Sequence, residues 1–479
     1  MNYSIILYIL GWVLKLEGAF MLLPLGVSLI YREEGAYYFA VIGVVCALLG
    51  YLLSFKKVKN QNFYAREGFV VVALSWIVMS IMGCLPFYIS GEIPKFTDAL
   101  FETVSGFTTT GASILTDVEA LSHGMQFWRC FTHWIGGMGV LVFMIALLPS
   151  VGGQNIFLMR AESPGPTVGR LEPRIQQTAK VLYVLYFVLT AAEFVLLLLA
   201  GMPVYEAICT AFGTAGTGGF GVMGDSMASY STAIQVIVTV FMLMFGVNFN
   251  FYFYLVVRKW KDAFHMEEVR AYLLIFVAAT ALIAVNLLDI SKNFLYNLQQ
   301  AAFQVASIVT TTGYATADFD QWPELSRMIL VLLMFIGGCA GSTGGSVKVS
   351  RHLISLKRLK KEFERLTHPK SVKALKMDGK PISNDVVHST MTFIYAFLLI
   401  FVASVLLISL DNFDFATNFT AVAATIGNVG PGLSLVGPTA NYSIFSTFSK
   451  YVLMFDMLAG RLELFPLLLL FLPGTWRRR

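Results

Sequence analysis

The sequence predicts an all-α polytopic membrane protein, built from four pseudo-repeats that follow two additional N-terminal transmembrane helices. The prediction depends on the composition, on a series of long apolar runs, and on a glycine-rich loop that recurs four times. Hydrophobic residues make up 57% of the 479 residues, and charged residues only 13%. A soluble domain has about 25% charged residues, so this chain lacks the polar surface that water requires.

Ten apolar runs are long enough to cross a membrane, because a spanning helix needs about 20 mostly apolar residues. They lie near 5–30, 37–54, 68–90, 125–150, 177–200, 231–257, 270–289, 324–348, 389–410 and 444–472. If these spans alternate in direction, most Lys and Arg residues of the connecting loops fall on one side. Basic loops favour the cytoplasmic side, so we expect a multi-pass protein with both termini in the cytoplasm.

Four loops on the opposite side each contain a short apolar stretch, near 95–107, 203–214, 296–309 and 413–425. Segments of this length are too short to span and are typical of re-entrant helices. The repeating unit is therefore a span, a half-helix, a glycine-rich loop and a second span. It divides the chain into the N-terminal helices (1–67) and four repeats, at 68–175, 176–267, 268–381 and 382–479.

The glycine-rich loops can be aligned with one another. They read SGFTTTGA from Ser105, FGTAGTGG from Phe212, SIVTTTGY from Ser307 and ATIGNVGP from Ala424. One glycine aligns in all four: Gly111, Gly218, Gly313 and Gly430. A single TTTG could be an extracellular turn. Four copies in equivalent positions favour a pore, because irregular backbone at membrane depth is tolerated only within protein or beside a water-filled cavity.

We expect these loops to form one cation filter, with fourfold pseudo-symmetry within the chain. A ring of carbonyl oxygens can replace the hydration shell of a cation, and glycine reaches the dihedral angles that such a ring requires. The half-helices would point the negative ends of their dipoles at the same axis. The predicted filter residues are Thr109, Thr110, Gly111, Gly216, Thr217, Gly218, Thr311, Thr312, Gly313, Asn428, Val429 and Gly430.

The pattern resembles the membrane subunit of the bacterial Trk-type potassium transporters, within the Trk/Ktr/HKT superfamily. The resemblance covers nearly the whole chain, and its most specific motifs are FTTTGA from Phe107, GGCAGSTGG from Gly337 and GRLE from Gly460. It implies potassium uptake across the bacterial inner (plasma) membrane, with K⁺ as the transported ion and no covalently bound cofactor. It also implies a homodimer and a cytosolic regulatory subunit that binds the nucleotide. Relatives with serine at the position of Gly111 tend to favour sodium.

A glycine-rich segment interrupts the eighth span. Five glycines in nine residues, at about 1 kcal/mol each relative to alanine, make a poor helix interior. We expect an unwound loop below the filter, and the resemblance implies an intramembrane gating loop here. Close helix packing through small residues is the alternative. The candidate gate residues are Gly337, Gly338, Gly341, Ser342, Thr343, Gly344 and Gly345, together with Arg461 in the last span.

Arg461 is the second part of the candidate gate. An arginine at the membrane centre costs at least about 2.5–3.5 kcal/mol, so it should face water or a partner. Pairing with Asp456 or Glu463 is one possibility. The other places its charge below the filter, where it lowers the local occupancy of cations, and the resemblance supports this second arrangement.

Two further charged groups have open interpretations. The stretch from Arg351 to Lys380 is basic and partly amphipathic, which is typical of a helix on the inner membrane surface. A docking surface for the cytosolic partner is the alternative. Nine acidic residues lie around the predicted outer mouths of the pore. They could concentrate cations there, or they could serve only to cap helices and to keep the loops solvated. They are Asp98, Glu102, Asp117, Glu206, Asp225, Asp318, Asp320, Asp411 and Asp414.

Three classes of function were compared. A gated potassium pore is favoured, because the repeats share one orientation around one axis. A secondary transporter that couples potassium or sodium to protons or another ion is the alternative. An enzyme would need a nucleophile or metal set, and the five cysteines and six histidines form none, so K⁺ at the filter is the one metal expected. The net charge of +5 reflects membrane orientation rather than binding to nucleic acid.

Overall fold

The computed structural model describes residues 1–55, 64–139, 175–369 and 374–476, and it is almost entirely helical. Within these ranges, six helices are long and apolar enough to cross a membrane, or seven if the bent pair Thr232–Phe245 and Phe249–Val256 counts as one span. A two-stranded hairpin, β1 (Lys376–Met377) with β2 (Lys380–Pro381), is the one sheet in the described residues. The predicted all-α membrane class is confirmed.

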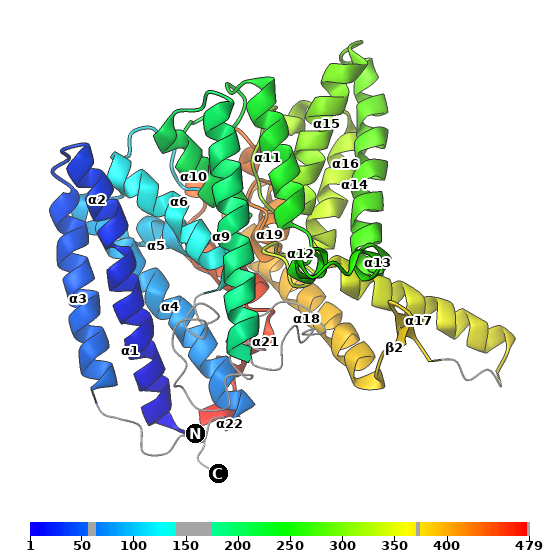
Figure 1. Ribbon diagram of the computed structural model, residues 1–479, viewed down its shortest axis with the longest axis horizontal. Helices are drawn as coiled ribbons and strands as arrows, with labels where there is room; N and C mark the ends of the chain where they lie inside the picture. The colour runs from blue at the N-terminus through cyan, green and yellow to red at the C-terminus, as the bar shows by residue number, and fades with distance from the viewer. Residues whose placement is uncertain (56–63, 140–174, 370–373, 477–479) are drawn as a thin grey trace.

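The N-terminal helices form a hairpin at one edge of the molecule (Figure 1). Its helices are α1 (Tyr3–Phe20), α2 (Leu22–Ile30) and α3 (Ala36–Ser54). Glycines let the backbones of α1 and α3 approach closely. A Cβ atom on Gly11 would lie 2.7 Å from the carbonyl oxygen of Gly50, and one on Gly50 would lie 2.6 Å from that of Gly11. Small residues at such crossings are typical of helix pairs in membranes.

Each of the four repeats contains a long first helix, a short pore helix and a second helix. The first helices are α4 (Ala65–Ser90), α9 (Ile175–Leu199), α14 (Glu267–Asn286) and α18 (Asn384–Ile408). The pore helices are α5 (Phe96–Phe107), α10 (Val204–Ala215), α15 (Phe294–Val309) and α19 (Phe415–Ile426). The second helices are α6 (His123–Met138), α11 (Thr232–Phe245), α16 (Glu324–Ile336) and α20 (Thr447–Arg461).

Five further helices and several 3₁₀ turns complete the described chain. They are α12 (Phe249–Val256), α13 (Trp260–His265), α17 (Val349–Thr367), α21 (Phe465–Phe471) and α22 (Pro473–Trp476), with 3₁₀ turns η1 (Leu287–Asp289), η2 (Phe319–Gln321), η3 (Ser409–Asp411), η4 (Ser434–Val436) and η5 (Tyr442–Ile444). Serine and aspartate N-caps begin several of the helices: the side chain of Ser231 accepts from the amide of Ile234, and that of Asp414 from Thr417.

The second helices do not cross the membrane as straight rods. We expected a break only in the eighth span, where α16 does end at Ile336 and irregular backbone continues to α17. The expectation of uninterrupted spans at 231–257 and 444–472 was wrong. The first bends by 91° between α11 and α12, and the second stops at Arg461 and resumes at Phe465.

The first unexpected break coincides with a tertiary contact, and the second with a local change of backbone conformation. At the end of α11, the carbonyl of Gly246 accepts a hydrogen bond from the amide of Cys339 in the glycine-rich segment, at 2.9 Å. At the end of α20, Glu463 and Leu464 adopt φ values of 56° and 65°, which end the helix. In the first repeat, α6 ends at Met138, and the remainder of the predicted span, 140–150, lies outside the described residues.

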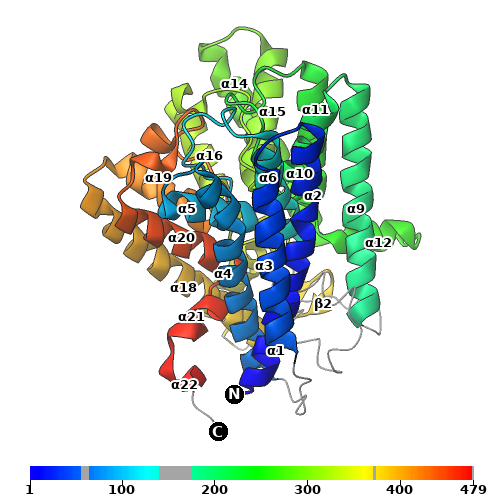
Figure 2. The same cartoon turned by 90° about the vertical axis from the view of Figure 1, so that its left-hand side faces the viewer.

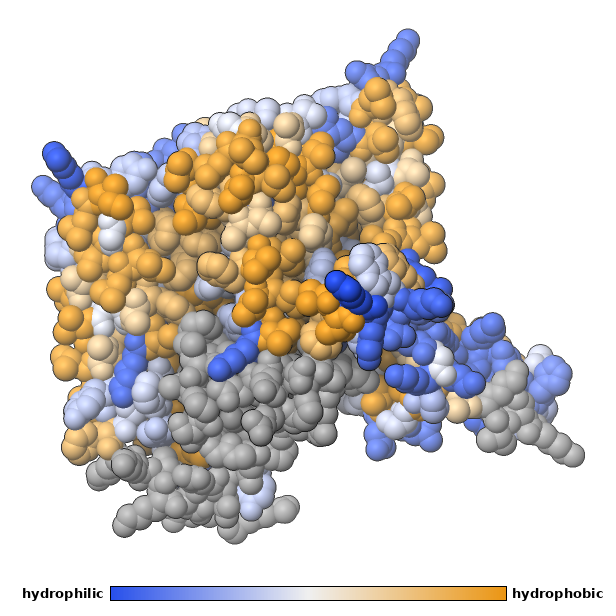
Figure 3. Space-filling model, viewed as in Figure 1, coloured by the Kyte–Doolittle hydropathy of each residue, from blue (hydrophilic) through white to orange (hydrophobic). Residues whose placement is uncertain are grey.

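The surface matches a protein that lies in lipid. Apolar side chains cover most of the visible face, and hydrophilic ones gather along its upper edge and around α13 and α17 (Figure 3). Large apolar residues point outward from the long helices: Leu52 is 69% exposed on α3 and Leu399 is 71% exposed on α18. Both chain termini lie at the same end of the molecule (Figures 1 and 2).

We expect Gly50→Leu to separate α1 from α3 and to lower the free energy of unfolding by about 2 kcal/mol or more, because the new side chain would meet backbone atoms of Gly11 and Lys15 as well as the Lys15 side chain. Thermal unfolding in detergent measures the effect. Gly26→Leu on α2 is the matched control, because no atom lies within 4 Å of a Cβ there. Equal stability of the two variants would contradict the close α1–α3 contact.

Candidate functional site

All four pore helices end in the same three-residue turn. The first residue after each C-cap has a positive φ: 55° at Thr109, 53° at Thr217, 60° at Thr311 and 52° at Asn428. The amide of the next residue bonds to the carbonyl five positions earlier. These bonds are Thr110 to Ser105 at 2.9 Å, Gly218 to Gly213 at 2.9 Å, Thr312 to Ser307 at 2.8 Å and Val429 to Ala424 at 2.8 Å. The repeats are therefore equivalent at the level of single hydrogen bonds.

This turn corrects the alignment of the second loop by one residue. In each loop, a glycine with left-handed backbone stands two positions after the first positive-φ residue of the turn. These glycines are Gly111 (φ 78°), Gly219 (77°), Gly313 (86°) and Gly430 (98°). Gly219, not Gly218, is the equivalent of Gly111. Gly218 occupies the position of Thr110, Thr312 and Val429. The two adjacent glycines were the one sequence signal for this alternative, and only the hydrogen bonds distinguish between them.

The four left-handed glycines close a ring. A Cβ atom on Gly111 would lie 2.0 Å from the carbonyl oxygen of Gly218, and one on Gly219 would lie 2.0 Å from that of Thr312. One on Gly313 would lie 2.3 Å from the Val429 oxygen, and one on Gly430 would lie 2.7 Å from the Thr110 oxygen. Each glycine thus packs against the next loop in the order one, two, three, four and back to one. No side chain fits at these four contacts.

A cavity of about 140 Å³ opens on one face of this ring, and all four left-handed glycines line it. Residues from the following loop segments, among them Ser113, Met223 and Tyr442, form its walls. The cavity therefore lies on the side of the ring where each loop continues from its ring glycine toward the second helix of the repeat. We call this cavity the vestibule.

Polar groups on the other face of the ring are buried, and two have no partner. Thr109 Oγ1 and Asn428 Oδ1 have no hydrogen-bond partner within the described part of the chain. In the other loops, Thr217 Oγ1 donates to the Gly216 carbonyl, and Thr311 Oγ1 accepts from the amide of Gly345 at 2.6 Å. Buried, unpartnered oxygens at equivalent positions of a ring are suitable ligands for a hard cation.

Hydroxyl pairs stiffen two of the loops. Thr108 Oγ1 lies 2.8 Å from Thr110 Oγ1, and the equivalent oxygens of Thr310 and Thr312 are 2.7 Å apart. The fourth loop uses Asn428, whose Nδ2 donates to Thr110 Oγ1 and to the Met457 carbonyl, both at 2.9 Å. The second loop has Gly216 and Gly218 at the positions of these threonines, so no such pair can form there.

The glycine-rich segment lies directly against the inner ends of the loops. The amide of Gly345 bonds to Thr311 Oγ1, and a Cβ on Gly345 would lie 2.5 Å from the Gly427 carbonyl oxygen. The segment is irregular from Gly337 (φ 74°) to the start of α17, as expected. The other predicted gate residues form hydrogen bonds within the segment or with neighbouring helices. Ser342 Oγ donates to the Cys339 carbonyl, Gly338 O accepts from Val349 N, and Gly341 O accepts from Phe249 N.

Arg461 reaches this segment from the end of α20. Its Nη1 donates to the Thr343 carbonyl at 2.7 Å, and its Nη2 donates to the carbonyls of Gly136 and Gly137 at 2.5 and 2.6 Å. The two carboxylates that we considered as partners have other contacts: Glu463 pairs with Arg351, and Asp456 accepts from Ser404 Oγ at 2.7 Å. The guanidinium group therefore joins the segment to the end of α6.

The nine acidic candidates have structural partners. Asp98 pairs with Lys450 at 2.6 Å, Glu102 with Arg129 at 2.6 Å and Asp320 with Arg327 at 3.0 Å. The other six accept hydrogen bonds from nearby amides or hydroxyls: Asp117, Glu206, Asp225, Asp318, Asp411 and Asp414. None of the nine is among the described residues that line the vestibule. Capping and pairing explain these residues.

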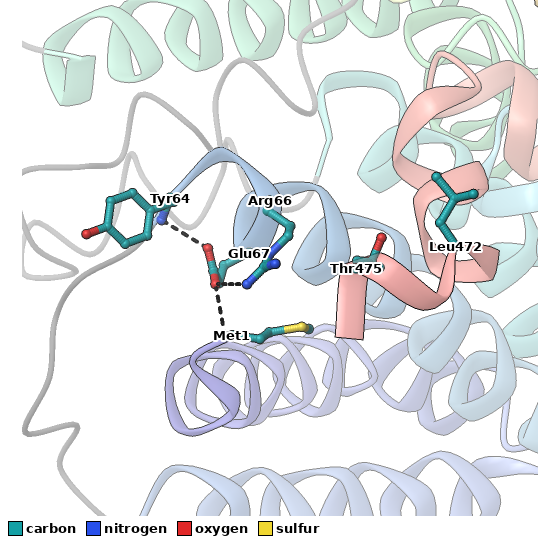
Figure 4. A pocket seen from close by; sticks show the side chains of 7 residues that line it. Met1, Tyr64, Arg66, Glu67, Leu472 and Thr475 are labelled. Carbon is teal, nitrogen blue, oxygen red and sulfur yellow. Dashed lines mark hydrogen bonds and ion pairs between the residues drawn. The ribbon is translucent and has the colours of Figure 1, made fainter. Parts of the chain in front are cut away.

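A larger cavity, of about 690 Å³, lies elsewhere, between the two termini and the start of α4 (Figure 4). The N-terminal amine is 4.0 Å from Glu67 Oε1, and Glu67 Oε2 accepts from the amide of Tyr64. No residue of the ring or of the glycine-rich segment lines it. Size alone therefore does not identify the functional site.

Helix α17 carries the predicted basic, amphipathic segment and projects away from the body of the molecule (Figure 1). Leu353 packs against the protein core. The other four predicted apolar positions are exposed: Leu356, Leu359, Phe363 and Leu366. This apolar stripe has no partner among the residues that the structure describes, and such a stripe is suited to a membrane surface or another protein chain.

Comparison with known proteins identifies the family. Residues 37–476 match the family model described as "TrkH: Cation transport protein". The chain is 37% identical to the Trk system potassium uptake protein TrkH of Salmonella typhimurium (strain LT2) over the full length of both. The chain belongs to the TrkH family of cation transport proteins. It is also 32% identical to TrkG of Escherichia coli (strain K12), over 99% of each chain.

A solved structure of the family has the same fold. The crystal structure of the potassium transporter TrkH from Vibrio parahaemolyticus matches all of this chain with a TM-score of 0.89, at 36% identity. The predicted resemblance is therefore confirmed, and so is the arrangement of four pseudo-repeats after two N-terminal spans.

We expect Gly219→Ala to disrupt the ring, because it adds a Cβ at a left-handed position, 2.0 Å from the Thr312 oxygen. The backbone penalty alone is about 1–2 kcal/mol. Gly221→Ala, in the same loop, is the control, because the nearest atom to its Cβ would be 3.8 Å away. Thermal unfolding of both variants measures the difference. A Gly219 variant as stable as the Gly221 variant would contradict the corrected alignment.

Proposed function

We propose that this protein takes up potassium across the bacterial inner membrane, through the ring that the four loops close. The observation that supports this most strongly is the cyclic packing of Gly111, Gly219, Gly313 and Gly430, each on a carbonyl of the next loop. Relatives aligned over the whole chain are named potassium uptake proteins. K⁺ is then the cargo of the ring, and not a resident cofactor.

The chemistry of the ring suits a weakly hydrated monovalent cation. Backbone carbonyls from four loops can replace water around K⁺ without a full negative charge, so the ion can also leave. The four pore helices end at these loops, and each C-terminus contributes about half a negative charge. The free oxygens Thr109 Oγ1 and Asn428 Oδ1 add ligands at the inner end. In this proposal, the filter residues of the second loop are Thr217, Gly218 and Gly219.

The segment from Gly337 to Gly345, with Arg461, is proposed as the gate. It touches the inner ends of loops three and four, so it occupies the path that an ion would take on leaving the ring. The fixed charge of Arg461 adds an electrostatic barrier, because two unit charges a few ångströms apart repel strongly where water is scarce. Opening requires the segment to move away from Thr311 and from Arg461.

The cytoplasmic side is proposed to be the end that carries both termini and the basic loops. Helix α17, with its exposed Leu356, Leu359, Phe363 and Leu366, is then available on that side. We propose that a cytosolic nucleotide-binding regulatory subunit acts on the gate from this side, and that the protein works as a homodimer. Any nucleotide would bind to the regulatory subunit.

Secondary transport is the second candidate, because broken helices such as α11–α12 and α20–α21 are typical of secondary transporters. The closed ring of four loops favours the pore. The two can be separated in liposomes at a clamped membrane potential: potassium flux through a pore then follows the electrochemical gradient of potassium alone, whereas coupled transport also responds to an imposed proton or sodium gradient.

We expect Gly111→Ser to raise the ratio of sodium to potassium flux by about tenfold, the factor that corresponds to 1.4 kcal/mol. The serine Cβ would displace the Gly218 carbonyl, so the ring could no longer hold the spacing that suits potassium. Flux of each cation into proteoliposomes measures the ratio. Gly91→Ser is the matched control: Gly91 also has left-handed backbone (φ 79°), but nothing lies within 4 Å of its Cβ. An unchanged ratio at Gly111 would refute the filter.

We expect Arg461→Ala to raise the basal flux without a regulator by roughly tenfold, because the barrier loses its fixed charge and three carbonyl contacts. Deletion of Gly344 and Gly345 should act in the same direction. Flux must be normalised to folded protein. Lys360→Ala, on the exposed face of α17, is the control for loss of one positive charge. Normal folding with unchanged or lower basal flux in both gate variants would refute the gate.

A further inference from the structure

A buried ion pair lies behind the junction of the first and second loops. Glu102 of the pore helix α5 accepts from Nε of Arg129 on α6 at 2.6 Å, and the two side chains are 0% and 3% exposed. A buried pair contributes little net stability compared with well-packed apolar residues, because both charges lose their hydration. The other hydrogen bonds that Glu102 and Arg129 make, to the first and second loops, therefore matter more to the structure than the pair itself.

Glu102 holds the outer part of the first loop. Its Oε1 and Oε2 accept from Ser113 Oγ at 2.9 and 3.1 Å, and Oε2 also accepts from the amide of Ile114 at 2.9 Å. Ser113 and Ile114 follow closely on Gly111, where the backbone leaves the ring. One carboxylate therefore fixes both the hydroxyl and the backbone of this segment.

Arg129 holds the outer part of the second loop. Its Nη1 donates to the carbonyl of Gly221 at 3.1 Å, and its guanidinium carbon lies 3.6 Å from the ring centroid of Phe220. Gln126, one helical turn earlier, donates to the same Gly221 oxygen at 2.6 Å. Ile114, Glu102, Arg129 and Gly221 thus form one continuous hydrogen-bonded chain from the first loop to the second.

The second loop is the one that most needs an external support. It contains Gly216, Gly218, Gly219 and Gly221, and each glycine adds backbone freedom that folding must remove. It also lacks the hydroxyl pairs that stiffen loops one and three. Arg129 and Gln126 both donate to the Gly221 carbonyl, and the Arg129 guanidinium also packs on the Phe220 ring, so this side of the second loop is held from α6.

The equivalent pore-helix positions carry no charge in the other repeats, where Thr210, Gln304 and Ala421 stand nine residues before the ring glycine. Gln304 Nε2 lies 3.5 Å from Thr316 Oγ1, a neutral and weaker form of the contact that Glu102 makes. The charged version is found in the first repeat, although loops one and three both pack against the glycine-rich second loop. Arg129 also lines the vestibule, so Glu102 neutralises a cation that would otherwise repel incoming ions.

We propose that Glu102 and Arg129 are positioning residues that hold filter loops one and two in register, and that this support sets how well the filter excludes sodium. The inference rests on the proposed filter function. If the second loop is held from outside by Arg129, weakening the pair lets the ring at Gly111 and Gly219 relax. A relaxed ring fits the smaller sodium ion more easily.

The experiment compares Glu102→Gln and Arg129→Lys with a matched control. Glutamine keeps an acceptor for Ile114 but loses the charge, and lysine keeps the charge but cannot reach both Glu102 and Gly221 as the planar guanidinium does. Lys450→Gln is the control, since it breaks another ion pair of the same pore helix, Lys450 with Asp98 at 2.6 Å, near the end far from the ring. Sodium and potassium fluxes and thermal stability are measured for each purified variant in liposomes and detergent.

We expect both variants of the pair to raise the sodium-to-potassium flux ratio by about tenfold, comparable to the loss of a charged hydrogen bond, while Lys450→Gln lowers stability without changing the ratio. Equal ratios in all three variants, at similar losses of stability, would overturn the proposal and leave the pair a structural one. Gly111→Ser is measured in parallel. If it too leaves the ratio unchanged, the filter assignment itself fails, whereas a change at Gly111 alone rejects only the role of the pair.

Discussion

The contact between a glycine and a carbonyl of the neighbouring loop is the constraint on which the remaining structure depends. It occurs four times. Three of the contacts join residues about a hundred positions apart, and the fourth joins Gly430 back to Thr110, so that the four contacts close the chain on itself. No side chain fits, and the glycine backbone is left-handed, so both requirements select the same residue. The pore helices, and the outer helices that hold them, serve to bring these four backbones together.

Four different sequences maintain one backbone geometry by different means. Loops one and three use pairs of threonine hydroxyls, and the fourth uses the amide of Asn428, which reaches across to Thr110. The second loop has none of these groups and contacts Arg129 instead. Pseudo-symmetry in this chain therefore describes the backbone, and each loop achieves it with its own side chains.

Below the ring, the structure is held by fewer and more scattered contacts. The glycine-rich segment meets the ring loops through the amide of Gly345, and the buried carboxylate of Glu268 accepts from the amides of Ala340, within the segment, and of Ser350, in the first turn of α17. Arg461 adds a bond to Thr343. Other hydrogen bonds of the segment go to the end of α11 and the start of α12: Phe245 and Gly246 accept from Thr343 and Cys339, and Phe249 donates to Gly341, so most of its contacts lie away from the ring.

The sequence by itself determined the membrane class, the four half-helices and the broken eighth span, because these follow from local apolar runs and glycine content. It also identified Gly111, Gly313 and Gly430, because each is the one glycine in its aligned position. Only the tertiary structure decided between Gly218 and Gly219, the breaks after α11 and α20, and the partners of Arg461 and Glu102. The choice between the two glycines and the break after α20 depend on the backbone dihedral angles of single residues. The break after α11 and the partners of Arg461 and Glu102 depend on hydrogen bonds between residues far apart in the chain, and local composition carries no information about them.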